Sequence, residues 1–363
     1  MKRLLFLVAA ALMVAMGAEA QKLKVIDSDG NAVSYASVLT STGEYVGITS
    51  LEGELADMKG AKAVTITHVA FKPKEVKVGS ADQVVTLEDA DFGLDEITVV
   101  PKPLVYVQTY YRMYVYSAKD GMIYYRVGIT DNAYDRQKKT VKGSTNHVAK
   151  STMGPIKFAL GLLGKIFDEQ FGEIKVEKVE DRMMKKYSSL GLKIVDAAPG
   201  KKNIVDKMGL VGSVVDDKKD GLRRYIYDTT KLYGHNLEAS GKSKNLKKME
   251  ERNTKKQNRH RTDYILYRID EEGNYAPEDF VMKENLDSYD ELVDGELDHQ
   301  IFAIQAFNTK RAYVTKEEYK QLKKDNKIKL TYENIKQFER QNNIPALLPV
   351  VQEKLKEVWK VDD

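Results

Sequence analysis

The sequence has 363 residues, of which 42% are hydrophobic and 31% are charged, so it is long and apolar enough for two folded domains and unlike a disordered chain. Its 58 basic and 54 acidic residues leave a net charge of +4, a balance too small to indicate a nucleic-acid partner. The sequence contains no cysteine, which excludes disulfides, thiolate metal sites and a cysteine nucleophile.

Residues 1–20 have the three parts of a secretory signal peptide. Lys2 and Arg3 form a positive start, an apolar run extends to Met16, and a small-x-small cleavage site ends at Ala20. The apolar run is too short to span the ~30 Å hydrocarbon core of a bilayer. We therefore expect cleavage near Ala20, an exported mature protein and no transmembrane span.

Residues 21–100 predict a seven-stranded β-sandwich, because short apolar runs alternate with turn signals. Gly30 and Gly53 stand where a tight turn needs a positive φ angle, which glycine adopts at little cost. The expected strands are residues 24–27, 36–40, 46–49, 63–69, 75–78, 83–87 and 96–100.

Several segments of this region match a family pattern, among them DSDG at 27–30, YASV at 35–38, EG at 52–53 and LDEITVV at 94–100. On these segments, the region resembles the carboxypeptidase-regulatory-like domain, a transthyretin-like or immunoglobulin-like sandwich. Such domains are generally non-catalytic and commonly precede outer-membrane receptors or other surface and periplasmic proteins. The resemblance thus implies a location in the periplasm or at the outer-membrane periphery of a diderm bacterium.

The region departs from the family pattern at two places. Ser50 replaces the usual acid of one turn, and Ala70-Phe71 replaces the usual Gly-Tyr pair. Phe71 still fills the aromatic position, so neither change threatens the fold. His68 is expected to be structural rather than a ligand, because polar groups on partly buried strands are usually satisfied internally.

Pro101 and Pro103 break any strand and mark the expected domain boundary. Residues 104–129 then predict a β-hairpin with its turn at Asp120 and Gly121. One face of its first strand is apolar and suits a core, whereas the other is rich in tyrosine.

The tyrosine face has two interpretations. Tyrosine offers a large surface and a polar tip, so this face could bind a ligand. The favoured alternative is that the tyrosines pack beneath a covering helix, since strands accept tyrosine readily. The candidate ligand-binding residues are Tyr106, Tyr110, Tyr114, Tyr116 and Tyr124.

Residues 104–310 are expected to form an α+β domain, with a curved antiparallel sheet and a covering helix. The helix is predicted at 155–167, where apolar residues recur at helical spacing; it would fill the core or, alternatively, face lipid. The Tyr-Tyr-Arg triplets at 110–112 and 124–126 give the domain a resemblance to incomplete barrels related to lipoprotein carriers. A receptor barrel of ~22 strands does not fit behind Pro103.

Two oppositely charged runs follow. Residues 242–261 are basic and contain no aromatic residue, so they predict a solvated helix or loop, or a contact with anionic lipid, rather than a nucleic-acid site. Residues 270–298 are acidic, and carboxylates are the ligands that Ca²⁺ prefers. The spacing does not match an EF-hand loop. The weak Ca²⁺ candidates are Asp290, Asp294, Glu296 and Asp298.

No catalytic motif is present: the five histidines form no HExxH pattern, and no serine stands in a G-x-S-x-G elbow. After a last strand at 300–307, residues 311–363 predict a helical segment. Thr315 opens a capping box and Thr331 begins a second helix, and a third extends to Trp359.

These observations predict an exported, non-enzymatic envelope protein with a binding or adaptor role and no cofactor. Its partner would be another envelope protein, a glycan or a lipid. The alternatives are an exported hydrolase whose site joins residues distant in sequence, for example His147 or His299 with carboxylates, and a scaffold subunit of an outer-membrane complex.

Overall fold

The computed structural model describes residues 22–58, 60–79, 82–91, 102–119, 121–152, 175, 177–232, 256–293, 295–326 and 331–359. The chain is mostly β and divides into two compact units, Met1–Ala90 and Asp91–Asp363. The predicted leader 1–20, the strand at 96–100, the helix at 155–167 and residues 242–255 of the basic run lie outside the described residues.

In the described part of the first unit, seven strands form two sheets, in the orders β4-β1-β7 and β3-β2-β5-β6. Buried and less buried residues alternate along β1 and β5, as expected of strands with one face in a core. The strands are β1 (Leu23–Ile26), β2 (Ser37–Thr40), β3 (Tyr45–Ile48), β4 (Glu54–Leu55), β5 (Ala63–His68), β6 (Phe71–Lys77) and β7 (Gln83–Thr86).

The turns of this unit follow the sequence signals. Gly30 and Gly53 have φ angles of 83° and 76°, as predicted. A Cβ on Gly53 would stand 2.4 Å from the carbonyl oxygen of Val25, so this position requires glycine. Ser50 takes the place of the acid that the family pattern has in this turn, because its hydroxyl accepts a hydrogen bond from the backbone N–H of Glu52 at 3.1 Å.

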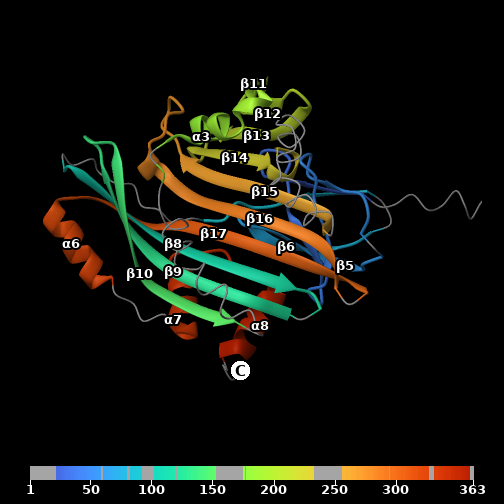
Figure 1. The fold of residues 1–363 in the computed structure, drawn as a ribbon. Helices are drawn as coiled ribbons and strands as arrows, with labels where there is room; N and C mark the ends of the chain where they lie inside the picture. The colour runs from blue at the N-terminus through green and yellow to red at the C-terminus, as the bar shows by residue number, and fades with distance from the viewer. Residues whose placement is uncertain are drawn as a thin grey trace, which may run out of the picture. The chain divides into compact units, whose positions relative to one another are not determined.

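The second unit is built on one ten-stranded antiparallel sheet, in the order β10-β9-β8-β17-β16-β15-β14-β13-β12-β11. Figure 1 shows its long strands curving together across the unit. The strands are β8 (Leu104–Ser117), β9 (Gly121–Asp135), β10 (Thr140–Thr152), β11 (Lys193–Ala198), β12 (Lys201–Asp206), β13 (Gly209–Asp217), β14 (Leu222–Asp228), β15 (Lys256–Arg268), β16 (Phe280–Val293) and β17 (Glu296–Val314).

Two of the hairpins in this sheet lie in segments for which the sequence makes predictions. The predicted hairpin is β8–β9, in which Ser117 pairs with Gly121. The acidic run forms most of a second hairpin, β16–β17, where Val293 pairs with Glu296 and Gly295 has a φ of 86°. Its Asp-Gly turn is a standard hairpin signal. The last strand is accordingly 19 residues long rather than the eight expected at 300–307.

The C-terminal helices begin where their caps predict. Thr315 accepts the backbone N–H of Glu318 to start α6, and Thr331 accepts that of Asn334 to start α7. No helix in the described part of the chain is long and apolar enough to cross a membrane. The helices are α3 (Val179–Lys186), α6 (Lys316–Asp325), α7 (Tyr332–Gln341) and α8 (Pro349–Trp359), with short 3-10 turns η1 (Ser188–Leu190) and η2 (Pro277–Asp279).

The two faces of the ten-stranded sheet pack against different helices (Figure 1). The inner face, which carries Val107 and Tyr111, forms the main core together with α3. The outer face, which carries Tyr106 and Tyr110, contacts α6 and α7. On the inner face Gly128 leaves room for the ring of Tyr111, whose hydroxyl oxygen would lie 2.3 Å from an added Cβ.

Candidate functional site

Four of the five predicted ligand-binding tyrosines lie on the outer face. Tyr106, Tyr110 and Tyr114 are at most 3% exposed, and Tyr116 is partly buried. The ring of Tyr106 lies 6.2 Å from that of Tyr319 in α6. The ring of Tyr110 lies 5.4 Å from that of Phe338 in α7. Helices do cover this face, as the sequence predicts, and they are the C-terminal helices α6 and α7.

Tyr124 lies on the inner face, apart from the other four. It pairs with Val115, and the register shifts between Val115 and Tyr116. A bulge adds one residue to a strand, and side chains alternate, so everything beyond it changes face. Tyr124 therefore lies on the opposite face of the sheet from Tyr106, Tyr110, Tyr114 and Tyr116.

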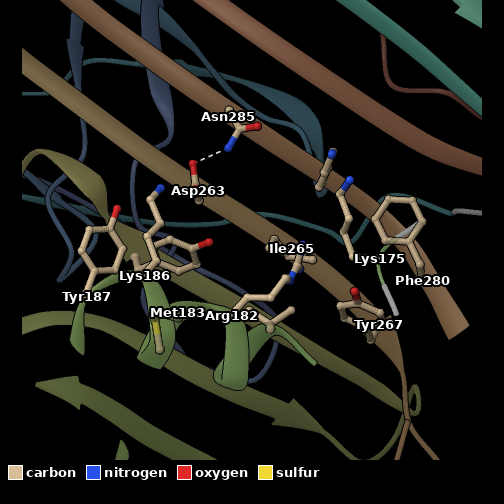
Figure 2. A pocket seen from close by; sticks show the side chains of 13 residues that line it. Lys175, Arg182, Met183, Lys186, Tyr187, Asp263, Ile265, Tyr267, Phe280 and Asn285 are labelled. Carbon is tan, nitrogen blue, oxygen red and sulfur yellow. Dashed lines mark hydrogen bonds between the residues drawn. The ribbon is translucent and has the colours of Figure 1, made fainter. Parts of the chain in front are cut away.

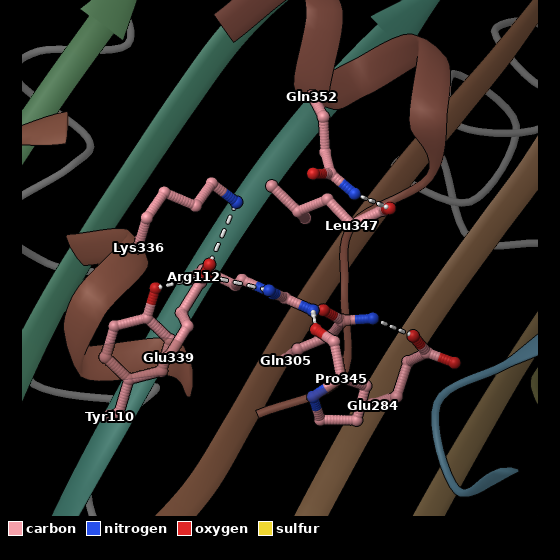
Figure 3. Close-up of polar contacts among 9 residues, drawn as sticks. All are labelled: Tyr110, Arg112, Glu284, Gln305, Lys336, Glu339, Pro345, Leu347 and Gln352. Atoms are coloured by element: carbon pink, nitrogen blue, oxygen red, sulfur yellow. Dashed lines mark hydrogen bonds and ion pairs between the residues drawn. The ribbon is translucent and has the colours of Figure 1, made fainter. Parts of the chain in front are cut away.

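The outer face is sealed to α7 by a buried guanidinium (Figure 3). Arg112 donates from Nε to Gln305 at 2.6 Å, from one terminal nitrogen to Glu339 at 2.8 Å, and from the other to the carbonyl of Pro345 at 2.7 Å. Its side chain is 1% exposed and that of Glu339 is 6% exposed. A buried charge is tolerated when its hydrogen bonds are this fully satisfied.

The carboxylate of Glu339 has further partners. It accepts a hydrogen bond from the Tyr110 hydroxyl at 2.8 Å and pairs with Lys336 at 2.9 Å. Burial favours its neutral form, but Arg112 and Lys336 outweigh burial and hold the pKa of Glu339 below its ordinary value. This cluster thus fixes α7 on the sheet.

The described Ca²⁺ candidates form hydrogen bonds or ion pairs near the turns of the hairpins. Asp298 is buried and accepts the Ser117 hydroxyl at 2.8 Å and the backbone N–H of Lys119 at 3.0 Å, so it closes the β8–β9 turn. Glu296 pairs with Lys119 at 3.3 Å. Asp290 contacts His299, and Asp294 lies outside the described residues.

One polar chain on the outer face has the connectivity of a hydrolase triad. The hydroxyl of Ser288 lies 3.2 Å from Nε2 of His299, whose Nδ1 lies 2.7 Å from Asp290. A nucleophile must also be reachable by its substrate, and Ser288 is 2% exposed. The side chain of His147 lies outside the described residues.

An open pocket lies on the inner face, between α3 and strands β14, β15 and β16 (Figure 2). Its volume is about 250 Å³. Aromatic and aliphatic side chains form about half of its walls, and polar groups from the helix and the sheet form the rest. It is lined by Lys175, Val179, Arg182, Met183, Lys186, Tyr187, Tyr227, Asp263, Ile265, Tyr267, Phe280, Lys283 and Asn285.

The helix that covers this pocket is held at its N-terminal end. Glu180 accepts hydrogen bonds from the hydroxyls of Tyr225 and Tyr275, and Tyr275 in turn accepts the backbone N–H of Val179 at 3.2 Å. Met183 points from the same helix into the core. These contacts place the cationic side chains of α3 over the sheet.

The pocket carries an excess of positive charge. Four of its described lining residues are cationic, and Asp263 is the single carboxylate among them. Asp263 accepts a hydrogen bond from Asn285, as Figure 2 shows. Burial and Asp263 raise the pKa of Tyr227 well above its ordinary value, and burial raises the pKa of Tyr267 to about 12, so both hydroxyls keep their protons at neutral pH.

Arg182 is a pocket cation with a buried, unsatisfied donor. Its Nε is buried and has no hydrogen-bond partner among the described residues. The positive charge of Arg182 acts on the hydroxyls of Tyr227 and Tyr267, so its guanidinium lies near both. A ligand in the pocket could satisfy this donor.

Sequence reasoning missed this pocket. Lys186 and Lys283 belong to segments about a hundred residues apart, and no motif connects them. The available signal was the alternation in β15, where Asp263, Ile265 and Tyr267 share one face.

A scan of the chain against protein-family models finds no match, and a search of curated proteins finds none either.

Proposed function

We propose that this chain is an exported, non-enzymatic binding protein of the cell envelope, and that its inner-face pocket binds a small amphipathic molecule with an acidic group. The observation that carries the proposal is the pocket of about 250 Å³ with aromatic walls and a cationic rim beneath α3. Concave, mostly apolar sites with a few convergent polar groups are the usual form of ligand pockets.

The size and lining favour one apolar chain over a bulky ligand. Drug-sized ligands occupy pockets of about 300–1,000 Å³, so this one holds a head group with a single short apolar segment. Met183, Ile265 and Phe280 supply apolar contact. Removing such surface from water is worth about 25 cal/mol per Å².

The cellular setting in the proposal comes from the N-terminal region. A leader-like segment at 1–20 supports export. The seven strands of the first unit, in a three-stranded and a four-stranded sheet, support a sandwich of the carboxypeptidase-regulatory-like kind as a non-catalytic adaptor. The proposed location is the periplasm or the outer-membrane periphery of a diderm bacterium, where the adaptor would contact another envelope protein.

Isothermal titration with octanoate, used as an anionic probe with a single apolar chain, tests the pocket. We expect one saturable site. Met183→Trp places a larger side chain in the pocket, so it should lower the affinity for the probe at least about tenfold. Met208→Trp changes the same residue type at a 55% exposed position and should leave binding unchanged.

The pocket proposal fails if the unsubstituted protein does not bind the probe, or if both tryptophan variants bind it equally. Circular dichroism and thermal unfolding of each variant show whether the fold is kept. Ile265→Phe is a second, milder obstruction on the sheet side of the same pocket and should weaken the probe in the same direction.

The alternative, an exported hydrolase, is favoured by the Ser288–His299–Asp290 chain. Because Ser288 is 2% exposed, we expect a fluorophosphonate probe to leave it unlabelled. Intact-protein mass spectrometry measures this directly. Labelling of Ser288 that disappears in His299→Ala would establish the hydrolase and displace the binding proposal.

A further inference from the structure

We propose that the protein docks on an anionic bilayer surface through exposed lysines at one edge of the second unit. These lysines belong to α6 and to the turn region between β9 and β10, and they are called the lysine patch below. The docking does not depend on the inner-face pocket, which α3 covers. The lysine patch consists of Lys138, Lys139, Lys142, Lys316, Lys320 and Lys324.

The two segments of the lysine patch are distant in sequence and adjacent in the structure. The Tyr319 hydroxyl, on the buried side of α6, donates to the carbonyl of Asp131 at 3.1 Å and lies 3.5 Å from that of Lys142. Lys142 pairs with Ala133, which packs in one cluster with Tyr319, so the Lys142 side chain projects from the outer face beside α6. Figure 1 shows α6 beside the ends of β9 and β10.

The lysines of α6 form a row along one side of the helix. Lys316, Lys320 and Lys324 are exposed and four residues apart, so they lie one above the other. Like charges at this spacing destabilise a helix, and Lys316, as the first residue, also opposes the helix dipole. The row therefore lowers the stability of α6, which points to a role outside folding.

The acidic residues of α6 do not neutralise this row. Glu318 pairs with Lys102 at 2.7 Å and closes the capping box of the helix. Asp325 accepts a hydrogen bond from Gln321 at 2.7 Å. Within the described part of the chain, no lysine of the patch forms an ion pair or a side-chain hydrogen bond. Glu317 is the one acid of α6 that stands against these lysines without such a partner, so an excess of positive charge remains.

The turn between β9 and β10 adds two lysines to the same edge. Asp135 accepts the backbone N–H groups of Gln137 at 3.1 Å and Lys138 at 3.0 Å, so its carboxylate fixes the turn. Lys139 has a φ of 50°, a conformation that glycine or asparagine adopts more easily. Both lysines are exposed, and the turn again keeps lysine where another residue would suit the backbone better.

The composition of the lysine patch favours a bilayer over a protein partner. Protein interfaces are enriched in aromatic residues and arginine and depleted of lysine. The patch contains only lysines, the ring of α6 belongs to the buried Tyr319, and the exposed large hydrophobic side chains of the described residues lie in other segments. Clusters of about four to eight basic residues are typical of contacts with anionic lipid, whose negative surface potential attracts each of them.

Co-sedimentation with lipid vesicles tests the docking. We expect the protein to sediment with vesicles of equal parts phosphatidylglycerol and phosphatidylcholine, and to stay in solution with vesicles of phosphatidylcholine alone. Raising the salt concentration from about 0.1 M to about 1 M should release the protein, because the Debye length falls from about 10 Å to about 3 Å.

A triple variant locates the contact on the molecule. Lys316→Gln, Lys320→Gln and Lys324→Gln together remove the row on α6, and glutamine has nearly the helix propensity of lysine. Each lysine held near an anionic surface increases partitioning about fivefold, so the triple variant should bind the anionic vesicles roughly a hundredfold more weakly.

A second triple variant controls for net charge. Lys193→Gln, Lys202→Gln and Lys218→Gln remove the same number of exposed lysines from the β11–β13 end of the sheet, whose opposite edge is β10. Charges farther from the bilayer than the Debye length of about 10 Å are screened, so this variant should keep its affinity within about twofold. Circular dichroism of both triple variants shows whether the fold is kept.

Three results would overturn the docking. The first is a protein that does not bind the anionic vesicles, or that binds the neutral ones equally. The second is an equal loss of affinity in the two triple variants, because the attraction then reflects net charge instead of the lysine patch. The third is binding to soluble polyglutamate without binding to vesicles, lost in the α6 variant alone; the lysine patch then recognises an acidic polypeptide.

Discussion

An arginine side chain packs on each side of the ten-stranded sheet, and the two are paired in opposite ways. On the outer face, all three nitrogens of Arg112 donate to defined acceptors, and Glu339 compensates its charge. On the inner face, Arg182 stands among other cations, and its buried Nε has no partner among the described residues. Both side chains belong to the same folded unit, so the contrast is one of environment.

This difference separates structure from function. A charge that is buried and fully paired contributes to stability, because removing either partner strands the other in a poorly solvating medium. A charge left incompletely paired contributes little to folding and remains available to a ligand. The outer face is therefore a seal between the sheet and the C-terminal helices, and the inner face is where a ligand belongs.

The largest expected effect is on the seal. Arg112→Met leaves the carboxylate of Glu339 buried without its main partner, and should lower the free energy of unfolding by about 3–5 kcal/mol. Urea denaturation measures the loss. Lys102→Met breaks the more exposed pair with Glu318 and should change stability by less than about 1 kcal/mol.

A double variant tells lost charge compensation apart from lost packing. Arg112→Met combined with Glu339→Leu removes both charges, so it should recover a large part of the stability lost by Arg112→Met alone. If the two substitutions instead destabilise additively, the pairing of Arg112 with Glu339 is not what holds α7. The outer-face arginine would then not be an example of a charge that stabilises the fold through pairing.

A smaller effect is expected at the rim of the seal, where Glu284 accepts a hydrogen bond from Gln305. Burial raises the pKa of Glu284 to about 7, against the lowering by Gln305 and Arg112. Between its ordinary pKa and about 7 the folded protein binds more protons at this site than the unfolded chain, so its contribution to stability falls as pH rises through this range.

Glu284→Gln should remove that dependence. Because part of the Glu284 surface is exposed and water screens its charge, we expect a gain of about 1 kcal/mol at pH 8 and a negligible change at pH 4. Denaturation curves of both proteins across this range provide the measurement. An equal effect at both pH values would mean that Glu284 ionises normally in the folded protein.

The local features of the fold could be predicted from the sequence because short-range chemistry determines them. Thr315 and Thr331 cap helices where their side chains and spacing predict, and the turn at Gly121 joins two paired strands. The covered tyrosine face also follows from alternation, which requires that a strand with two apolar or aromatic faces be buried on both sides.

Features that depend on register or on distant segments could not be predicted. A single bulge places Tyr124 on the inner face, and the hairpin sequence contains no signal for this bulge. Composition alone predicts a Ca²⁺ site in the acidic run, whereas the Asp-Gly pair at 294–295 between alternating residues indicates the β16–β17 hairpin. The pocket arises only when α3 packs across β14–β16, a long-range contact that leaves no periodic trace in the sequence.

The smallest stability effect is expected for the substitution that matches the largest one. Arg182→Met makes the same chemical change as Arg112→Met, but the guanidinium it removes forms no ion pair with an acid among the described residues, so stability should stay within about 0.5 kcal/mol of the unsubstituted protein. Urea denaturation of the two variants side by side is the measurement. A loss above about 2 kcal/mol for Arg182→Met would show that this residue is paired and structural. In that case the two faces would treat arginine alike, and the cationic rim would no longer indicate a ligand.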